Sequence, residues 1–175
     1  MSLKNLIRKT LQKFNYEVRK FPGSSFTPVS VFDLSVHFLM ASKTSNMSFI
    51  QVGANDGLYD DPIRKFVLNY PWTGVLIEPQ PEVFLRLVKN YEHLKSRLAF
   101  ENLAVSPDKL SIQLFQSPNY SLADTDHKAA VVSTDRKITA RQLGLPPKEL
   151  ITCSVPCTSL DAVVKKHEIT NLDLL

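Results

Sequence analysis

The chain has 175 residues, of which 43% are hydrophobic and 22% charged, so it can bury one sizeable core and we expect a single globular domain. Its formal net charge is +4, and the excess of basic residues falls before residue 23, which leaves the rest near neutral. A nucleic-acid-binding protein would spread basic residues along its working surface, so we exclude that class. No apolar run approaches the roughly 20 residues that cross a bilayer, and no signal-peptide core is present, so we expect a cytoplasmic protein.

Residues 1–22 form the first predicted element, a basic amphipathic helix. Apolar residues recur there at three- and four-residue steps, which places them on one stripe with basic residues opposite. The stripe consists of Leu3, Leu6, Ile7, Leu11, Phe14 and Val18. Two interpretations stay open: the helix packs on its own domain, or it docks on an anionic membrane surface or a partner protein. Pro22 and Gly23 end it, and a second helix is predicted over residues 31–40.

Residues 48–105 alternate between predicted strands and helices. The apolar run 48–52 leads into a glycine turn, which is typical of a buried strand that ends at a loop. The elements predicted after it are a helix that begins at Asp61 and Pro62, a strand at 75–78, a helix at 83–94 and a strand at 98–105. This order implies parallel strands joined by right-handed crossovers. We therefore predict an α/β fold, with a Rossmann-like open, mostly parallel sheet and flanking helices.

The second half of the chain has a weaker pattern. Residues 110–115 alternate apolar and polar side chains, which predicts a half-exposed strand. Residues 116–150 show no clear period, so we expect an irregular insert with one short helix at most. A strand over 151–157, a helix with a capping box formed by Thr158 and Asp161, and a further strand from 172 complete the prediction. Together, residues 23–175 are assigned to one domain.

Cys153 and Cys157 are the only cysteines, and they lie four residues apart on a predicted strand. A disulfide at that spacing would fold the strand back on itself, and no second pair of Cys or His accompanies them to form a zinc site. We therefore expect two buried free thiols and no metal.

The glycine turn at residues 53–57 and the acid Glu78, at the end of the next predicted strand, suggest a nucleoside site. Ligands of a parallel α/β sheet bind beyond the carboxyl ends of its strands, and glycines let the backbone approach them closely. A carboxylate at the neighbouring strand end can accept hydrogen bonds from both ribose hydroxyls. The alternative is a plain strand-to-helix turn next to a solvated carboxylate.

The turn does not match the fingerprint of dinucleotide-binding proteins. Asn55 occupies the second glycine place of the G-x-G-x-x-G pattern, and Asp56 follows it. A carboxylate at this point would repel a pyrophosphate, but it would tolerate a cofactor that carries an amino group and a sulfonium. No phosphate-binding loop for ATP or GTP occurs either.

These residues resemble the FkbM-type methyltransferases, which are class I S-adenosylmethionine-dependent enzymes. Residues 52–57 match a motif of the form Val-Gly-Ala-Asn-x-Gly, residues 78–81 a motif Glu-Pro-x-Pro, and residues 102–106 a motif Asn-x-Ala-Val-Ser. Residues 156–161 match a Pro/Val-x-Thr-x-Leu-Asp segment that leads into a Leu-Asp-Leu-Leu strand. The resemblance runs from about residue 49 to the last residue.

The resemblance implies S-adenosylmethionine as the cofactor and assigns roles to the matching positions. The methionine end would be lined by Gly53, Asn55 and Gly57, the ribose would be bound by Glu78, and the adenine would face the backbone between Asn102 and Ala104.

Two further positions follow from the resemblance. Tyr59 would neighbour the methionine carboxylate of the cofactor. Gln51 stands where such enzymes commonly have an acid, so its amide can hydrogen-bond the cofactor's ammonium but gives it no charge partner.

The resemblance favours an enzyme that transfers a methyl group to an oxygen of a small molecule or glycan. A hydroxyl acceptor needs a base, and Asp124, Asp126 and His127 of the insert are candidates, although solvated loop residues are commoner than bases. We therefore name no catalytic residue. The alternative is a catalytically silent module that binds the cofactor or a partner, and a dinucleotide-linked oxidoreductase is a more distant third.

In the family, a Lys-Ile-Asp-x-Glu-Gly segment would follow directly after Leu175, at the edge of the substrate cleft. We therefore expect a truncated member whose sheet stops before its last strands. Unpaired strand edges of this kind would favour association with another chain.

Overall fold

The computed structural model describes residues 30–43, 46–58, 61–118 and 131–175. The chain divides into two compact units, Met1–Thr44 and Ser45–Leu175. Helix α2 (Val31–Ser42) belongs to the first unit, and its N-terminus is capped by Ser30, whose side chain accepts a hydrogen bond from the Asp33 N–H at 3.1 Å. This confirms the helix predicted over 31–40. The helix predicted over 1–22 lies outside the described residues, and the domain boundary predicted after it stays a prediction.

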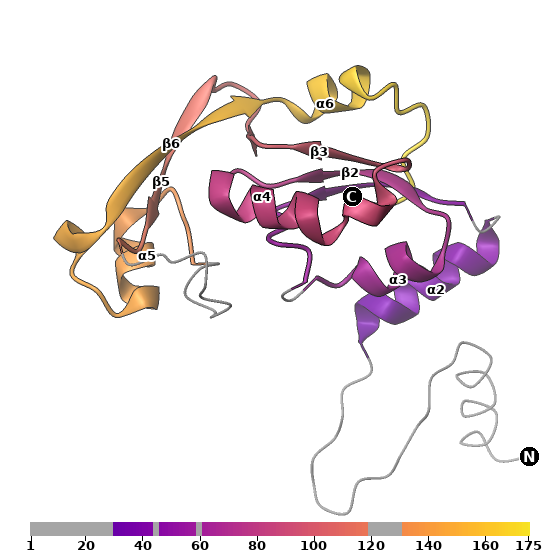
Figure 1. The fold of residues 1–175 in the computed structure, drawn as a ribbon, viewed down its shortest axis with the longest axis horizontal. Coiled ribbons are helices and arrows are strands. Elements are labelled where there is room, and N and C mark those ends of the chain that lie inside the picture. Colours follow the sequence, from indigo (N-terminus) through magenta and orange to yellow (C-terminus); the bar gives the residue numbers. More distant parts are fainter. Residues whose placement is uncertain (1–29, 44–45, 59–60, 119–130) are drawn as a thin grey trace, which may run out of the picture. The chain divides into compact units, whose positions relative to one another are not determined.

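The second unit contains a parallel sheet of three strands, in the order β1 (Ser48–Val52), β2 (Thr73–Ile77) and β3 (Leu98–Glu101) (Figure 1). On the other side of β1, Leu174 forms a parallel bridge with Phe49, and its carbonyl accepts the Ile50 N–H at 3.0 Å. The C-terminal segment therefore begins to pair with the sheet, as its strand pattern predicts. The mixed α/β fold and the parallel sheet confirm the predicted fold class.

This pairing makes β1 the point at which the strand order of the sheet reverses. The chain moves from β1 to β2 and β3 on one side, and returns to the other side of β1 only at its end. Ligands of open α/β sheets bind in the crevice outside the carboxyl ends of strands at such a point. The topology therefore predicts a ligand site at the loop that follows Val52.

Helices cover both faces of the sheet (Figure 1). Helix α6 (Leu160–Lys166) packs Val163 against a buried cluster of Ile50, Val75 and Ile77. Helices α3 (Arg64–Asn69) and α4 (Pro81–Asn90) lie on the opposite face, and a short 3₁₀ turn (Glu92–Leu94) follows α4. The alternation of side chains along β1 separates these two layers, because residues 49 and 50 point to opposite faces.

The face on the side of α3 is filled by aromatic side chains. Trp72 is completely buried, and its ring stacks on Phe66 of α3 with a centroid distance of 5.4 Å. Phe49 of β1 lies 6.1 Å from the same indole. Aromatic pairs of this geometry add to the stabilisation from buried area. The Trp72 cluster therefore anchors the start of β2 to β1 and α3.

The strand predicted over 98–105 is divided in two, which corrects that prediction. Strand β3 ends at Glu101, and β4 (Ala104–Val105) pairs instead with β6 (Ile151–Thr158) in a second sheet, where β5 (Ser111–Gln116) is the other neighbour of β6. Between them, the Asn102 side chain donates to the carbonyls of Glu78 at 2.8 Å and Pro79 at 3.2 Å. Asn102 thereby binds the turn after β2, and the chain leaves the first sheet there.

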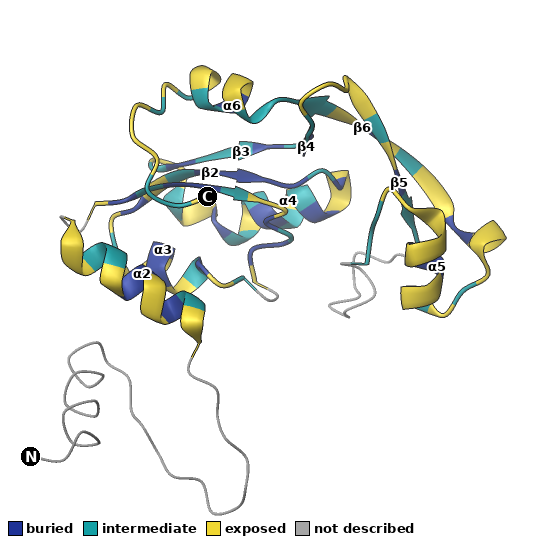
Figure 2. Cartoon of the chain, turned by 180° about the vertical axis from the view of Figure 1, so that it is seen from behind, coloured by how far each residue is buried: buried dark blue, intermediate teal, exposed yellow. Residues whose placement is uncertain are grey.

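Strands β5 (Ser111–Gln116) and β6 (Ile151–Thr158) are antiparallel and form, with helix α5 (Arg136–Leu143), an arm that extends away from the three-stranded sheet (Figures 1 and 2). Figure 2 shows that much of the arm is exposed. Its small core consists of Ala104, Leu114 and Val155. The described part of the irregular insert thus holds the one short helix that was expected, followed by a 3₁₀ turn (Pro147–Glu149).

Two predicted helix starts are shifted. Helix α6 is capped by Ser159, whose hydroxyl accepts the Ala162 N–H at 3.1 Å, and not by Thr158. Helix α3 begins at Arg64 and not at Pro62, although Asp61 still accepts the N–H groups of Ile63 and Arg64. Ser159 is a cap of the predicted chemical type and has extended backbone geometry, whereas Ile63, the residue before α3, is already in the helical region and makes no side-chain cap.

Cys153 and Cys157 are free, as predicted, but they are half-buried and not buried. They flank Val155 on one face of β6 and pack against the small core of the arm. Because the arm offers only one covered face, its thiols keep part of their surface exposed.

Candidate functional site

The glycine turn and the acid at the end of β2 come together at the carboxyl ends of neighbouring strands. The N–H groups of Gly53 and Ala54 both donate to the Ile77 carbonyl at 2.9 Å, so the loop after β1 bends over the tip of β2. The Asn55 N–H then donates to Oε2 of Glu78 at 3.0 Å. The two features that the sequence analysis paired therefore meet in space.

Glu78 is a buried acid, with only 4% of its surface exposed. Its second oxygen, Oε1, accepts the Gln80 N–H at 2.9 Å. Burial raises the pKa of Glu78 above its usual range, while the N–H groups of Gln80 and Asn55 act in the opposite direction. A carboxylate has about four acceptor positions, and two backbone N–H groups and the Gln80 side chain already bind this one, so it can still accept one hydroxyl donor.

The loop over Glu78 has three residues in the left-handed region: Gly53 (φ 75°), Asn55 (φ 50°) and Gly57 (φ 70°). A Cβ atom at Gly57 would lie 2.4 Å from the Tyr91 ring, whereas a Cβ at Gly53 would meet nothing within 4 Å. The two glycines therefore serve different purposes. Gly57 lets the loop pack tightly on α4, and Gly53 leaves open space at the end of β1.

Side chains from α3 and α4 donate hydrogen bonds to two carbonyls of this loop. Asn90 donates its amide N–H to the Asp56 carbonyl, and Arg64 donates from Nη1 to the Gly57 carbonyl, both at 2.8 Å. The guanidinium of Arg64 also lies 4.9 Å from the centre of the Tyr91 ring. Asn90 and Arg64 carry no signal in the local sequence pattern, because nothing there links their side chains to the loop carbonyls.

Gln51 belongs to a hydrogen-bonded group centred on Asp61. The Gln51 amide donates to Oδ1 of Asp61 at 3.2 Å, and the Tyr91 hydroxyl donates to Oδ2 at 2.7 Å. Burial, together with the hydrogen bond to Asp61, raises the pKa of Tyr91, so the phenol stays a neutral donor. The remaining atom, Oε1 of Gln51, is buried and has no hydrogen-bond donor among the described residues.

The other predicted site residues differ in position. Asn102 contacts the turn that follows Glu78, whereas the Ala104 side chain is buried in the core of the arm. The remaining predicted residues, Tyr59, Asp124, Asp126 and His127, lie outside the described residues.

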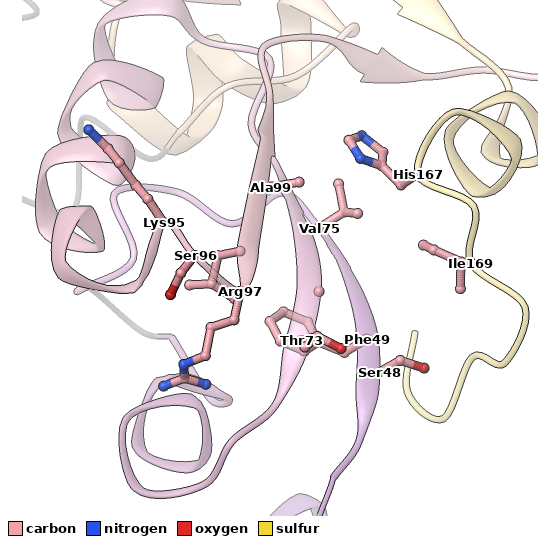
Figure 3. A pocket seen from close by; sticks show the side chains of 12 residues that line it. Ser48, Phe49, Thr73, Val75, Lys95, Ser96, Arg97, Ala99, His167 and Ile169 are labelled. Carbon is pink, nitrogen blue, oxygen red and sulfur yellow. The ribbon is translucent and has the colours of Figure 1, made fainter.

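A cavity of about 390 Å³ lies at the end of the sheet where its strands begin (Figure 3). It opens between the starts of the strands, represented by Ser48 and Thr73, and the segment after α6, which contributes His167 and Ile169. Figure 3 shows Val75, Ala99, His167 and Ile169 around this space. Because it lies away from the carboxyl ends of the strands and from Glu78, its size does not make it the better candidate.

A family model described as the methyltransferase FkbM domain matches residues 51–175. The chain belongs to the FkbM methyltransferase family. The matched region begins at Gln51, so the Glu78 site lies within the FkbM domain, and the resemblance drawn from the sequence motifs is confirmed. Neither the comparison with curated proteins nor the comparison with solved structures finds a match.

Proposed function

We propose that this member of the FkbM family is an S-adenosylmethionine-dependent methyltransferase that binds the ribose of its cofactor through Glu78. The observation that carries the proposal is the meeting of the glycine loop with a buried carboxylate that keeps an acceptor position free. A ribose hydroxyl is a matching donor for this position.

The residues around Glu78 fit the rest of this cofactor. Gly53 has open space beside it at the end of β1, and Oε1 of Gln51 is a buried acceptor that lacks a donor among the described residues. The ammonium of the methionine moiety would supply such a donor. Asp56 is buried within the loop, and its negative charge disfavours the phosphates of a dinucleotide. This charge supports a sulfonium cofactor over NAD.

When bound, S-adenosylmethionine supplies a methyl group that its positively charged sulfur already activates. The contribution of the chain is to hold the nucleoside rigidly, so that the acceptor can approach along one direction. Glu78 and the hydrogen bonds from Asn90 and Arg64 to the loop perform this task. We propose an oxygen of a small molecule or glycan as the acceptor, whose proton a base must remove.

Calorimetric titration with S-adenosylhomocysteine tests the proposal. We expect Glu78→Ala to weaken binding about 10- to 100-fold, because hydrogen bonds to a charged acceptor contribute about 1.5–3 kcal/mol. Glu149→Ala, at an exposed acid of the arm, is the matched control and should bind like the wild type. A folded wild-type chain that binds NADH but not S-adenosylhomocysteine would contradict the assignment.

A further inference from the structure

Gln80 is a buried amide next to the proposed ribose site. The residue is 7% exposed, and its Oε1 has no hydrogen-bond donor among the residues that the structure describes. A buried acceptor without a donor is costly and therefore rare, so it calls for a specific explanation. A ligand that supplies the missing donor would explain this acceptor.

The Glu78 carboxylate determines how this amide is oriented. Both the backbone N–H of Gln80, at 2.9 Å, and the Gln80 side chain hydrogen-bond Glu78. Oε1 is the amide atom without a hydrogen-bond partner, so the bond to Glu78 is made by the NH₂ group. Rotating the amide by half a turn would set its oxygen against a carboxylate oxygen. The orientation is therefore locked.

The position of Gln80 relative to the ribose site is also defined. Oε2 of Glu78 faces the glycine loop through the Asn55 N–H, whereas Oε1 faces Gln80. A nucleoside bound by Glu78 with its amino-acid end over the glycine loop would therefore direct its base toward Gln80.

Space for part of a ligand adjoins Gln80. A cavity of about 180 Å³ is lined by Gln80, Pro81, Glu82, Gln116 and Cys153. Complete ligand pockets have volumes of roughly 300–1,000 Å³, so this cavity suits one part of a ligand, such as a ring. It lies where the start of α4 meets the arm.

We infer that Gln80 recognises the exocyclic amino group of the adenine ring and is a specificity-determining residue for the base of the cofactor. The inference rests on the proposed function. Adenine offers an N–H donor, whereas hypoxanthine has a carbonyl oxygen at the same position and would set an acceptor against Oε1 of Gln80. Because Glu78 locks the amide, the site rejects hypoxanthine and does not adapt to it.

Calorimetric titration of the wild-type chain with S-adenosylhomocysteine and S-inosylhomocysteine tests the inference directly. We expect the adenosyl ligand to bind about 10- to 100-fold more tightly, since the inosyl ligand leaves a buried acceptor unpaired. In Gln80→Leu, which keeps the side-chain volume and removes the amide, the affinities for the two ligands should become similar. Gln142→Leu, at an exposed position of α5, is the matched control and should keep the wild-type ratio.

The outcomes separate the inference from the function on which it rests. Equal affinity of the folded wild-type chain for both ligands overturns the role of Gln80 and leaves the proposed function intact. An unchanged ratio in Gln80→Leu overturns it as well. No binding of S-adenosylhomocysteine by the folded wild-type chain overturns the proposed function itself. If circular dichroism shows that Gln80→Leu is unfolded, Gln80→Met replaces it, and the wild-type comparison decides in either case.

Discussion

Glu78 is a buried acid whose position is hard to explain by stability alone. Burial raises its pKa, which means that ionising it inside the protein is unfavourable relative to water. Gln51 and Gln80 are similar cases, because each keeps a buried oxygen without a donor among the described residues. These three groups are all acceptors, and they lie at the carboxyl ends of β1 and β2. Unfavourable buried acceptors gathered at one edge are expected where a donor-rich ligand binds.

The proposed role of the Gln51 side chain can be tested by mutation. Gln51→Leu removes the acceptor proposed for the cofactor's ammonium, so we expect S-adenosylhomocysteine to bind about tenfold more weakly. Binding of 5′-methylthioadenosine, which lacks the amino-acid end, should not change. Calorimetric titration with both ligands measures the difference, and Gln113→Leu, at an exposed position of β5, is the control. Equal weakening of both ligands would assign Gln51 to the support of the loop instead of the ammonium.

At the level of structural elements, residues 53–58 after β1 are held by contacts from several neighbouring elements. Two backbone N–H groups of the loop bind the tip of β2, and Asn90 and Arg64 bind two of its carbonyls. Its left-handed residues would otherwise favour other conformations in a free chain. Residues 53–58 are therefore preorganised by β2, α3 and α4 before any ligand binds.

The two glycines of this loop give a matched comparison. Gly53→Ala adds a left-handed alanine in open space, so we expect a loss of about 1–2 kcal/mol in the free energy of unfolding. Gly57→Ala adds the same strain and also a clash with the Tyr91 ring, so we expect a loss of about 2–5 kcal/mol. Urea unfolding followed by circular dichroism measures both. Equal losses in the two variants would show that the contact with Tyr91 is not tight.

Across the Ser45–Leu175 unit, stability should be unevenly distributed. Strand β2 is paired on both sides and contains Val75, Leu76 and Ile77, all with 2% exposure or less. The arm has a small core, and most residues of β6 are exposed or half-buried. Regions with few buried apolar contacts open at a lower free energy than the global unfolding transition.

Hydrogen exchange measured by mass spectrometry tests this difference. We expect peptides that cover β2 to exchange most slowly within the Ser45–Leu175 unit, and peptides that cover β5 and β6 to exchange at least tenfold faster, roughly the effect of 1.4 kcal/mol in opening free energy. Equal protection of the arm and of β2 would contradict the prediction and would indicate that the arm opens only with the whole unit.

Much of the fold could be predicted because its signals are local. The apolar runs before Gly53 and Glu78 identified β1 and β2, and the helical spacing after Pro81 identified α4. The division of the third strand at Asn102 was missed, because residues 98–105 have a continuous strand-like pattern. What divides it is a side-chain contact with the turn after β2, which belongs to a different part of the chain.

The candidate site shows the same contrast between features that are local in the sequence and contacts that depend on packing. The sequence alone determined that a glycine turn and an acid follow two successive buried strands, since strand patterns and turn residues are set by neighbours along the chain. Only the tertiary structure decided that Asn55 and Gln80 bind opposite oxygens of Glu78, that Gly57 packs on Tyr91, and that two glutamine oxygens are left without described donors. Such contacts depend on how separate elements pack together, and spacing along the chain does not encode them.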